Sequence, residues 1–220
     1  MVVPPAMTGE KMVRKESFWA EHLGEQVINP ALSIRDDGLL EGGMSSGSRD
    51  AEGVPRQQRT LVEQGRLCSM LWSTRDAAQQ VAEGRIEAAA STGSASSGVH
   101  QSPPTTGCTE LFLTSTEAPR SMDQLLAHMG DGYVVNSVMG AHTANPSSGD
   151  FSVTTSSILK VENGEIVGSL KQAGLSGNLA KSLNGAVHLG SDVRRQGSYS
   201  SGSMHLPDVL LMDGLRVNPA

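Results

Sequence analysis

The pair Asn163-Gly164 constrains the fold of this chain more than any other feature. Leu159 and Val161 lead into it, and a second β-favouring run containing Ile166 follows it directly. Asn-Gly tolerates the positive φ angles of a type I′ turn, whose twist suits two antiparallel strands. The sequence therefore predicts a tight hairpin at this point.

Two further turns have the same pattern of flanking apolar residues. Gln64-Gly65 separates Leu61 from Leu67, and Asp213-Gly214 separates Leu211 from Leu215. Gln is the weaker turn residue because it does not favour the left-handed region. Three such hairpins predict an antiparallel or mixed sheet.

Helices are fewer and short. Ser121 and Gln124 form a capping-box pattern, and apolar residues follow Ser121 at helical spacing until Gly130. The fold class predicted is a β-rich α+β domain with an antiparallel or mixed sheet and two or three short helices. The helices are expected at 121–129, 73–83 and 178–185, and further strands around 31–35, 110–114 and 133–138.

The length of 220 residues suits one large domain or two small ones, and we expect a single domain over residues 1–220. Aromatic residues make up only 3% of the chain, so the core must consist of aliphatic residues and methionine. Residues 91–107 are rich in Ser, Gly and Pro, a composition typical of a flexible loop.

Net charge and cysteine content exclude several classes of function. The net charge is −6 and no cluster of Lys or Arg occurs, which disfavours direct binding to DNA or to an anionic membrane. Two cysteines, Cys68 and Cys108, are typical of a reducing compartment, and we expect Cys68 to be buried. No apolar run has the length of a signal peptide or a membrane span, so a cytoplasmic location is expected.

Few residues are candidates for chemistry. His142 lies in a glycine-rich turn with Asp150 eight residues later. They could form an acid/base pair or two metal ligands, or they could be a polar loop residue and a turn cap. His100 and Cys108 have a spacing that fits no common zinc site.

Four carboxylates occur within 17 residues, at Asp36, Asp37, Asp50 and Glu52. Their spacing fits no EF-hand, and turn formation explains them better than binding of a hard cation.

Four segments, in order, resemble the C-terminal half of the TldD/PmbA family, whose members are also named modulators of DNA gyrase. The segments are the Asp-Asp-Gly turn at 36–38 with the DxEGxP turn at 50–55, the GxHxxNPxSGDFS block at 140–152, the Ser-Gly-Asn turn at 176–178 and the closing SGSMHLPDVLL. Each segment alone is a weak signal, but four in the right order are specific.

The resemblance implies a link to metallopeptidases and proteolysis. The catalytic branch of the family resembles a zinc peptidase, with an upstream HExxxH helix and a late cysteine. Neither is present here: His22 and Glu25 occur in the order HxxE, and Ser201 stands at the late position. Because serine is a poor zinc ligand, the chain is most similar to the PmbA (TldE-like) branch, and no cofactor is expected in it.

The resemblance therefore implies a non-catalytic subunit that assembles with a zinc-bearing TldD-like paralogue, or with itself as a dimer, and helps to process a peptide substrate. Two alternatives remain: a metallopeptidase half whose zinc motif comes from another chain, and a structural homo-oligomer without activity. His142, Asn145, Asp150 and Ser201 are the residues expected to face a partner or substrate.

Overall fold

The computed structural model describes residues 3–96, 103–198 and 202–219. Within these residues the elements run in this order: α1 (Val3–Ala6), α2 (Gly9–Val13), β1 (Leu32–Asp37), β2 (Gln58–Glu63), β3 (Arg66–Leu67), α3 (Thr74–Ala82), β4 (Ala95–Ser96), β5 (Thr105–Thr106), β6 (Glu110–Ser115), α4 (Met122–Met129), β7 (Gly132–Met139), the 3-10 turn η1 (Ala141–Thr143), β8 (Asp150–Glu162), β9 (Glu165–Leu170), β10 (Ala173–Asn178), α5 (Leu179–Asn184), β11 (Val187–Ser198), β12 (Gly202–Leu211) and β13 (Leu215–Pro219). The β-rich α+β class is confirmed.

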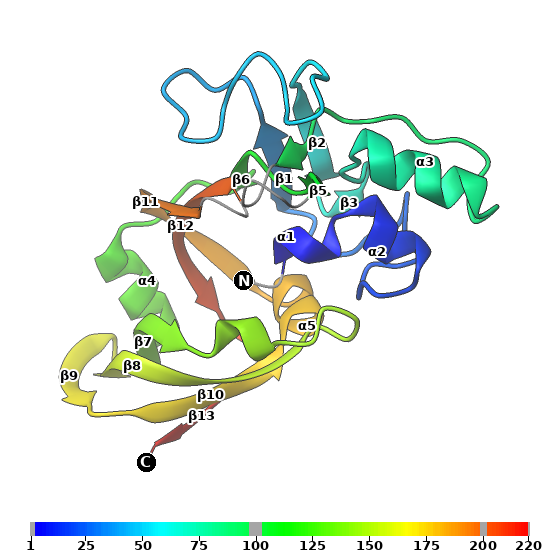
Figure 1. Cartoon of the computed structure of the whole chain (residues 1–220). Coiled ribbons are helices and arrows are strands. Elements are labelled where there is room, and N and C mark those ends of the chain that lie inside the picture. The colour runs from blue at the N-terminus through cyan, green and yellow to red at the C-terminus, as the bar shows by residue number, and fades with distance from the viewer. Residues whose placement is uncertain (1–2, 97–102, 199–201, 220) are drawn as a thin grey trace.

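Two sheets make up most of the molecule (Figure 1). The first is mixed, with strand order β11-β12-β6-β1-β2-β3, and β12 runs parallel to β6. The second is antiparallel, with order β13-β10-β8-β7, and β9 also pairs with β8. Helix α5 contacts β10 of one sheet and β11 of the other, so it bridges the two sheets.

The first two predicted hairpins are confirmed. Asn163 and Gly164 have φ angles of 52° and 80°, as a type I′ turn requires, and β8 pairs with β9 around them. Gln64 and Gly65 have φ angles of 45° and 79° between β2 and β3.

The third predicted hairpin is wrong. Strand β12 belongs to the six-stranded sheet, whereas β13 pairs with β10 in the other sheet. Gly214 has a φ of 80°, and a Cβ at this position would lie 2.6 Å from Ser182 Oγ of α5. The Asp213-Gly214 turn therefore carries the chain past α5 from one sheet to the other.

The three predicted helices are present with the expected caps. Ser73 Oγ accepts a hydrogen bond from the Asp76 amide at the start of α3, and Asn178 caps α5 in the same way. At α4 both hydrogen bonds of the capping box between Ser121 and Gln124 are formed.

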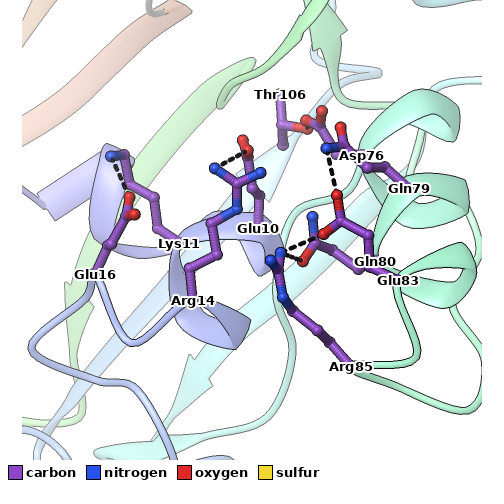
Figure 2. Close-up of polar contacts among 10 residues, drawn as sticks. All are labelled: Glu10, Lys11, Arg14, Glu16, Asp76, Gln79, Gln80, Glu83, Arg85 and Thr106. Carbon is purple, nitrogen blue, oxygen red and sulfur yellow. Dashed lines mark hydrogen bonds and ion pairs between the residues drawn. The ribbon is translucent and has the colours of Figure 1, made fainter.

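Helices α1 and α2 are too short for a periodic signal, and the sequence did not predict them. Helix α2 packs beside α3, and Figure 2 shows the polar side chains where the two meet. The Arg14–Glu10 pair of α2 has an N–O distance of 3.3 Å, and Arg85, just beyond α3, donates to Gln80 Oε1 at 2.8 Å and pairs with Glu83. Each of these pairs lies within one helix or at its end. Packing of α2 against α3, not helical propensity, therefore holds the N-terminal helices in place.

The main core lies against the six-stranded sheet and is mostly aliphatic, with Trp19 as its largest side chain. Cys68, which was expected to be buried, is exposed, because it lies just after β3 on the solvent side of Leu67. The buried members of the core are Met7, Met12, Trp19, Val27, Ile28, Leu32, Ile34, Leu61, Val62, Leu67, Leu71, Cys108, Leu111, Leu183, Val187, Leu189 and Met204.

The two ends of the Ser/Gly/Pro tract are ordered. Ala95 and Ser96 of β4 pair with Thr106 and Thr105 of β5 as a two-stranded ribbon. Residues 97–102, at the centre of the predicted flexible loop, lie outside the described residues.

The Asn163-Gly164 turn gives the first prediction. Replacing Gly164 with Val should lower the free energy of unfolding by about 1–3 kcal/mol, because a β-branched residue is strained at positive φ. Its Cβ would also lie 3.0 Å from Ala127 Cα of α4. The matched control is Gly168→Val on β9, where nothing lies within 4 Å of an added Cβ. Equal urea midpoints for the two variants would contradict the turn geometry.

Candidate functional site

Two of the family-like segments meet at Asp150 and Asn178. Asp150 begins β8 and Asn178 ends β10, and the two residues are directly opposite in the strand pairing. The Asn178 side-chain amide donates to Asp150 Oδ1 and to the Ser148 carbonyl, each at 2.8 Å. The GDFS block and the Ser-Gly-Asn turn, 28 residues apart, are therefore joined by a side-chain hydrogen bond.

Asn145 shapes the loop that leads into β8. Its side-chain oxygen accepts from the Ser147 amide at 2.9 Å, and its backbone exchanges hydrogen bonds with Asp150 and Gly149. The Phe18 amide donates to the carbonyl of Pro146 at 2.9 Å, which ties this loop to the N-terminal segment. Asn145 thus acts as a turn residue, and its amide group is engaged within the loop.

The other two predicted site residues are placed only in part. His142 lies in η1 with its backbone in a 3-10 turn, and its side chain is outside the described part of the structure. Ser201 directly precedes β12 and also lies outside it. Their expected roles stay predictions.

Asp150 is held in its anionic form. The hydrogen bonds from Asn178 and then from Ser148 lower the pKa of this exposed carboxyl, and Lys181 adds a smaller favourable charge. A surface depression of about 590 Å³ begins here and includes Asn178, Lys181 and Arg216. A carboxylate engaged in this way can orient a polar group of another molecule, but it is a poor general acid.

A second polar cluster was not predicted from the sequence. Glu110 of β6 is fully buried, and its Oε2 lies 2.8 Å from His205 Nε2 of β12. The other carboxylate oxygen accepts from the Ser45 amide at 2.7 Å. The loop between the Asp-Asp-Gly and DxEGxP turns, strand β6 and the closing SGSMHLPDVLL segment therefore converge on one carboxylate.

His205 is packed between an aromatic ring and charged groups. Its imidazole stacks on Phe112 of β6, with ring centroids 4.2 Å apart and an interplanar angle of 8°. On the other strand next to β6, Arg35 of β1 places its guanidinium 4.5 Å from the Phe112 centroid. Three neighbouring strands thus contribute one row of flat side chains to the outer face of the sheet.

Asp36, near the end of β1, and Cys108, just before β6, are both buried close to Glu110 in the chain or the sheet. Burial raises the pKa of Asp36 to about 6, although its carboxylate accepts the Thr109 amide at 2.7 Å. Burial, with the nearby charge of Asp36, raises the pKa of the Cys108 thiol to about 12. A thiol with so high a pKa is a poor nucleophile at neutral pH.

The acidic residues of the DxEGxP segment have the turn roles that their spacing predicts. Asp50 Oδ1 accepts from the Glu52 and Val54 amides at 2.9 Å, and its Oδ2 accepts from Ala95. Glu52 accepts from the amides of Thr74 and Arg75 at the start of α3. These carboxylates organise backbone instead of forming an open cation site.

Within the described residues, no three His, Cys, Asp or Glu side chains converge as a metal site. His22 and Glu25, the HxxE pair, form an exposed contact of 2.7 Å. His188 contacts Glu117 at 3.0 Å, with His128 edge-on to its ring. No described helix is long and apolar enough to cross a membrane.

The Glu110–His205 contact could not have been found from spacing alone. The two residues are 95 positions apart, and parallel pairing of β6 with β12 brings them together. The only local signal was a charged residue at the start of an apolar run, Glu110 before Leu111.

Asp36 gives the second prediction. The folded carboxyl binds its proton more tightly than the unfolded one, whose reference pKa is 3.8, so the free energy of unfolding should fall as pH rises from about 4 to about 6. Asp36→Asn removes this loss and keeps an acceptor for the Thr109 amide. We expect the variant to gain on the order of 2 kcal/mol over the parent between about pH 4 and pH 7. The exposed Asp192→Asn is the charge-matched control, and a pH-independent difference for Asp36→Asn would contradict the assignment.

Known proteins share both the sequence and the fold of this chain. Residues 1–218 match the family model described as the PmbA/TldA metallopeptidase C-terminal domain. The chain is 33% identical over 201 residues to an uncharacterized protein of Methanocaldococcus jannaschii, covering 91% of this chain and 44% of that protein. It is 29% identical over 213 residues to the Metalloprotease PmbA homolog of Haemophilus influenzae, covering 97% and 42%.

The fold is also similar to a solved structure, that of TldE from Thermococcus kodakarensis. The TM-score is 0.83 at 23% sequence identity, covering 99% of this chain and 46% of that chain. The chain spans less than half the length of each of these proteins. On the family match over nearly its whole length, the chain belongs to the PmbA/TldD metallopeptidase family and corresponds to its C-terminal domain.

Proposed function

We propose that this chain is the non-catalytic, partner-type subunit of a PmbA/TldD peptidase complex. It assembles with a zinc-bearing paralogue and contributes a wall to the chamber in which a peptide is processed. The observation that carries the proposal is in the sequence. Ser201 occupies the position at which the catalytic branch of the family is expected to carry a cysteine, and the chain contains no HExxxH.

The ionisable groups near the start of β12 support a structural role for that end of the sheet. Glu110 of β6 and His205 of β12 contact each other through their side chains. Glu110 also accepts the Ser45 amide, so its two oxygens are both engaged with the protein. A catalytic pair would instead direct at least one of these groups toward an open substrate position.

The loop at 140–149 is the surface we assign to the partner. It is built on a rigid base, because Asp150, Asn178 and the start of α5 are joined by hydrogen bonds. A loop on a rigid support is the usual way in which proteins present a binding surface. Its fixed backbone lowers the entropic cost of association.

The proposal predicts that the purified chain alone holds no stoichiometric zinc. Elemental analysis after purification without chelator should find well below one zinc per chain, and zinc should appear when a paralogue with HExxxH is co-expressed. One tightly held zinc per isolated chain would contradict the proposal. It would favour the alternative in which this chain is itself a metallopeptidase half.

The partner-facing loop gives a further prediction. Asp150→Ala and His142→Ala should leave the unfolding midpoint close to that of the parent and reduce co-purification with the zinc-bearing paralogue. The control is Asp131→Ala. Asp131 is an exposed aspartate that accepts a backbone amide, from Asn163 at 2.8 Å, where Asp150 accepts the side-chain amide of Asn178. If Asp150→Ala and Asp131→Ala co-purify equally well, the loop is not the contact surface.

A further inference from the structure

A pocket of about 540 Å³ lies between the two sheets beside helix α4. Its walls come from α4, from β7, β10 and β13 of one sheet, and from β11 and β12 of the other. Helix α4 contacts β11 and β12, and the Gly130 carbonyl at its end accepts the Gly164 amide of the β8–β9 turn at 2.7 Å. The helix therefore reaches from one sheet to the other and forms one wall of the pocket (Figure 1).

The lining of the pocket is mainly apolar. Leu175 of β10 and Val217 of β13 are direct cross-strand neighbours, and both are half-buried. Val209 and Met212, on the opposite wall, are 39% and 42% exposed. No described member of the main core comes from the five-stranded sheet. The part of this sheet that carries Leu175 and Val217 therefore borders the pocket, and its apolar side chains are open to a ligand.

Three methionines make the walls adaptable. Met122 and Met129 belong to α4, and Met212 directly follows β12. A Cβ at Gly132 would lie 2.6 Å from Met129 Sδ, so Met129 rests against the backbone of β7. Methionine is unbranched and fits irregular shapes, and binding surfaces rich in methionine accept apolar groups of more than one shape. The volume is within the range of pockets that hold small ligands.

The charged residues of the lining leave a negative charge. Two carboxylates, Asp131 and Asp208, and one guanidinium, Arg194, give −1. Arg194 pairs with Asp208 at 3.3 Å, whereas Asp131 accepts a backbone amide at 2.8 Å and forms no ion pair within the described residues. Lys160 pairs with Glu162, which together with a smaller contribution from Asp131 raises the pKa of Lys160. A cation can therefore be received at Asp131, and the lining offers an anion no unpaired positive charge.

The rim of the pocket also offers backbone polar groups. Residues 131–136 all line it, and consecutive residues of a strand reach one pocket only along the strand's edge, because their side chains alternate between the two faces. Within the described part of the chain β7 pairs only with β8, so this edge has donors and acceptors available. Such groups suit the polar backbone of a peptide better than the uniform chain of a lipid.

We propose that this pocket binds a peptide segment in which apolar side chains lie next to Lys or Arg. The apolar side chains enter between the sheets, and the cation lies near Asp131 at the rim. Burial of apolar surface drives binding, and charge selects the segment. The pocket belongs to this chain alone, so the inference does not depend on assembly with a zinc-bearing paralogue.

Fluorescence titration of the full chain with end-capped, dye-labelled tetrapeptides tests the site. The probes are Lys-Leu-Leu-Lys, its acidic counterpart Glu-Leu-Leu-Glu and its polar counterpart Lys-Ser-Ser-Lys. We expect the first to bind at least about tenfold more tightly than either of the others. Equal affinity of the first and second probes would overturn the charge selection. Equal affinity of the first and third, or no binding of the first, would overturn the apolar site.

Methyl spectra of the chain with isotopically labelled methionine locate the bound probe. Addition of Lys-Leu-Leu-Lys should shift the signals of Met122, Met129 and Met212. The signal of Met7, which is buried in the main core, should not move. Shifts confined to methionines outside the pocket, such as the exposed Met44, would overturn the assignment.

Two substitutions with matched controls separate the apolar and charge contributions. Val217→Thr places a hydroxyl on the wall with little change of shape, and Val167→Thr makes the same change on β9, outside the pocket, at a side chain that is 53% exposed. Asp131→Asn removes the charge and keeps an acceptor for the backbone amide. Its control, Glu87→Gln, removes an exposed charge that is not part of the lining.

We expect Val217→Thr to weaken binding of Lys-Leu-Leu-Lys at least about fivefold, because the buried hydroxyl gains no partner from an apolar side chain. Asp131→Asn should weaken it at least about threefold at low salt and less at high salt. Both controls should bind like the parent. Parent-like affinity of Val217→Thr would overturn the apolar site, and parent-like affinity of Asp131→Asn would overturn the charge selection. The probe comparison and the methyl spectra use the parent chain, so they decide the question even where a variant is unstable.

Discussion

The parallel pairing of β6 with β12 holds the two halves of the chain in one sheet. Ser203, Met204 and His205 lie opposite Glu110, Leu111 and Phe112, and these contacts join segments about 95 residues apart. Leu111 and Met204 face the core on one side, and Glu110 and His205 meet on the other. Without this pairing, β11 and β12 would not belong to the same sheet as β1–β3, and the polar cluster would not exist. Parallel pairing needs a long connection, which here contains most of the second sheet.

Buried carboxylates organise the irregular parts of the fold around this sheet. Asp36 accepts the Thr109 amide, Asp50 accepts the Ala95 amide, and Glu110 accepts the Ser45 amide. Each bond joins a strand or turn to backbone at least 45 residues away. Removing such a carboxylate would leave a backbone donor without its partner, which costs more than the bond itself contributes. Long glycine-rich loops can therefore remain ordered in a protein with few aromatic residues.

Local features were predictable and long-range ones were not. The turns at Asn163-Gly164 and Gln64-Gly65 and the caps at Ser121 and Asn178 depend on neighbouring residues, and they were correct. The Asp213-Gly214 hairpin failed because the same turn chemistry serves a crossing between sheets. Which alternative forms depends on the packing of Gly214 against α5.

The candidate site divides in the same way. The sequence predicted that Asp150 belongs to the glycine turn, and that Asn178 begins a helix. It did not predict the hydrogen bond between their side chains. The contact between Glu110 and His205 was not predictable, since it depends on the register of two distant strands. Cys68 was expected to be buried, but it is exposed. A strand of two residues next to a turn gives too short a pattern to show which face is buried.

The central claim is that this chain is the metal-free member of a mixed assembly. Native mass spectrometry of the chain co-expressed with an HExxxH-bearing paralogue tests it directly. The account predicts a complex that contains both chains, with one zinc for each copy of the paralogue and none added by this chain. A complex made of this chain alone, or a zinc count that follows its copy number, would contradict the account.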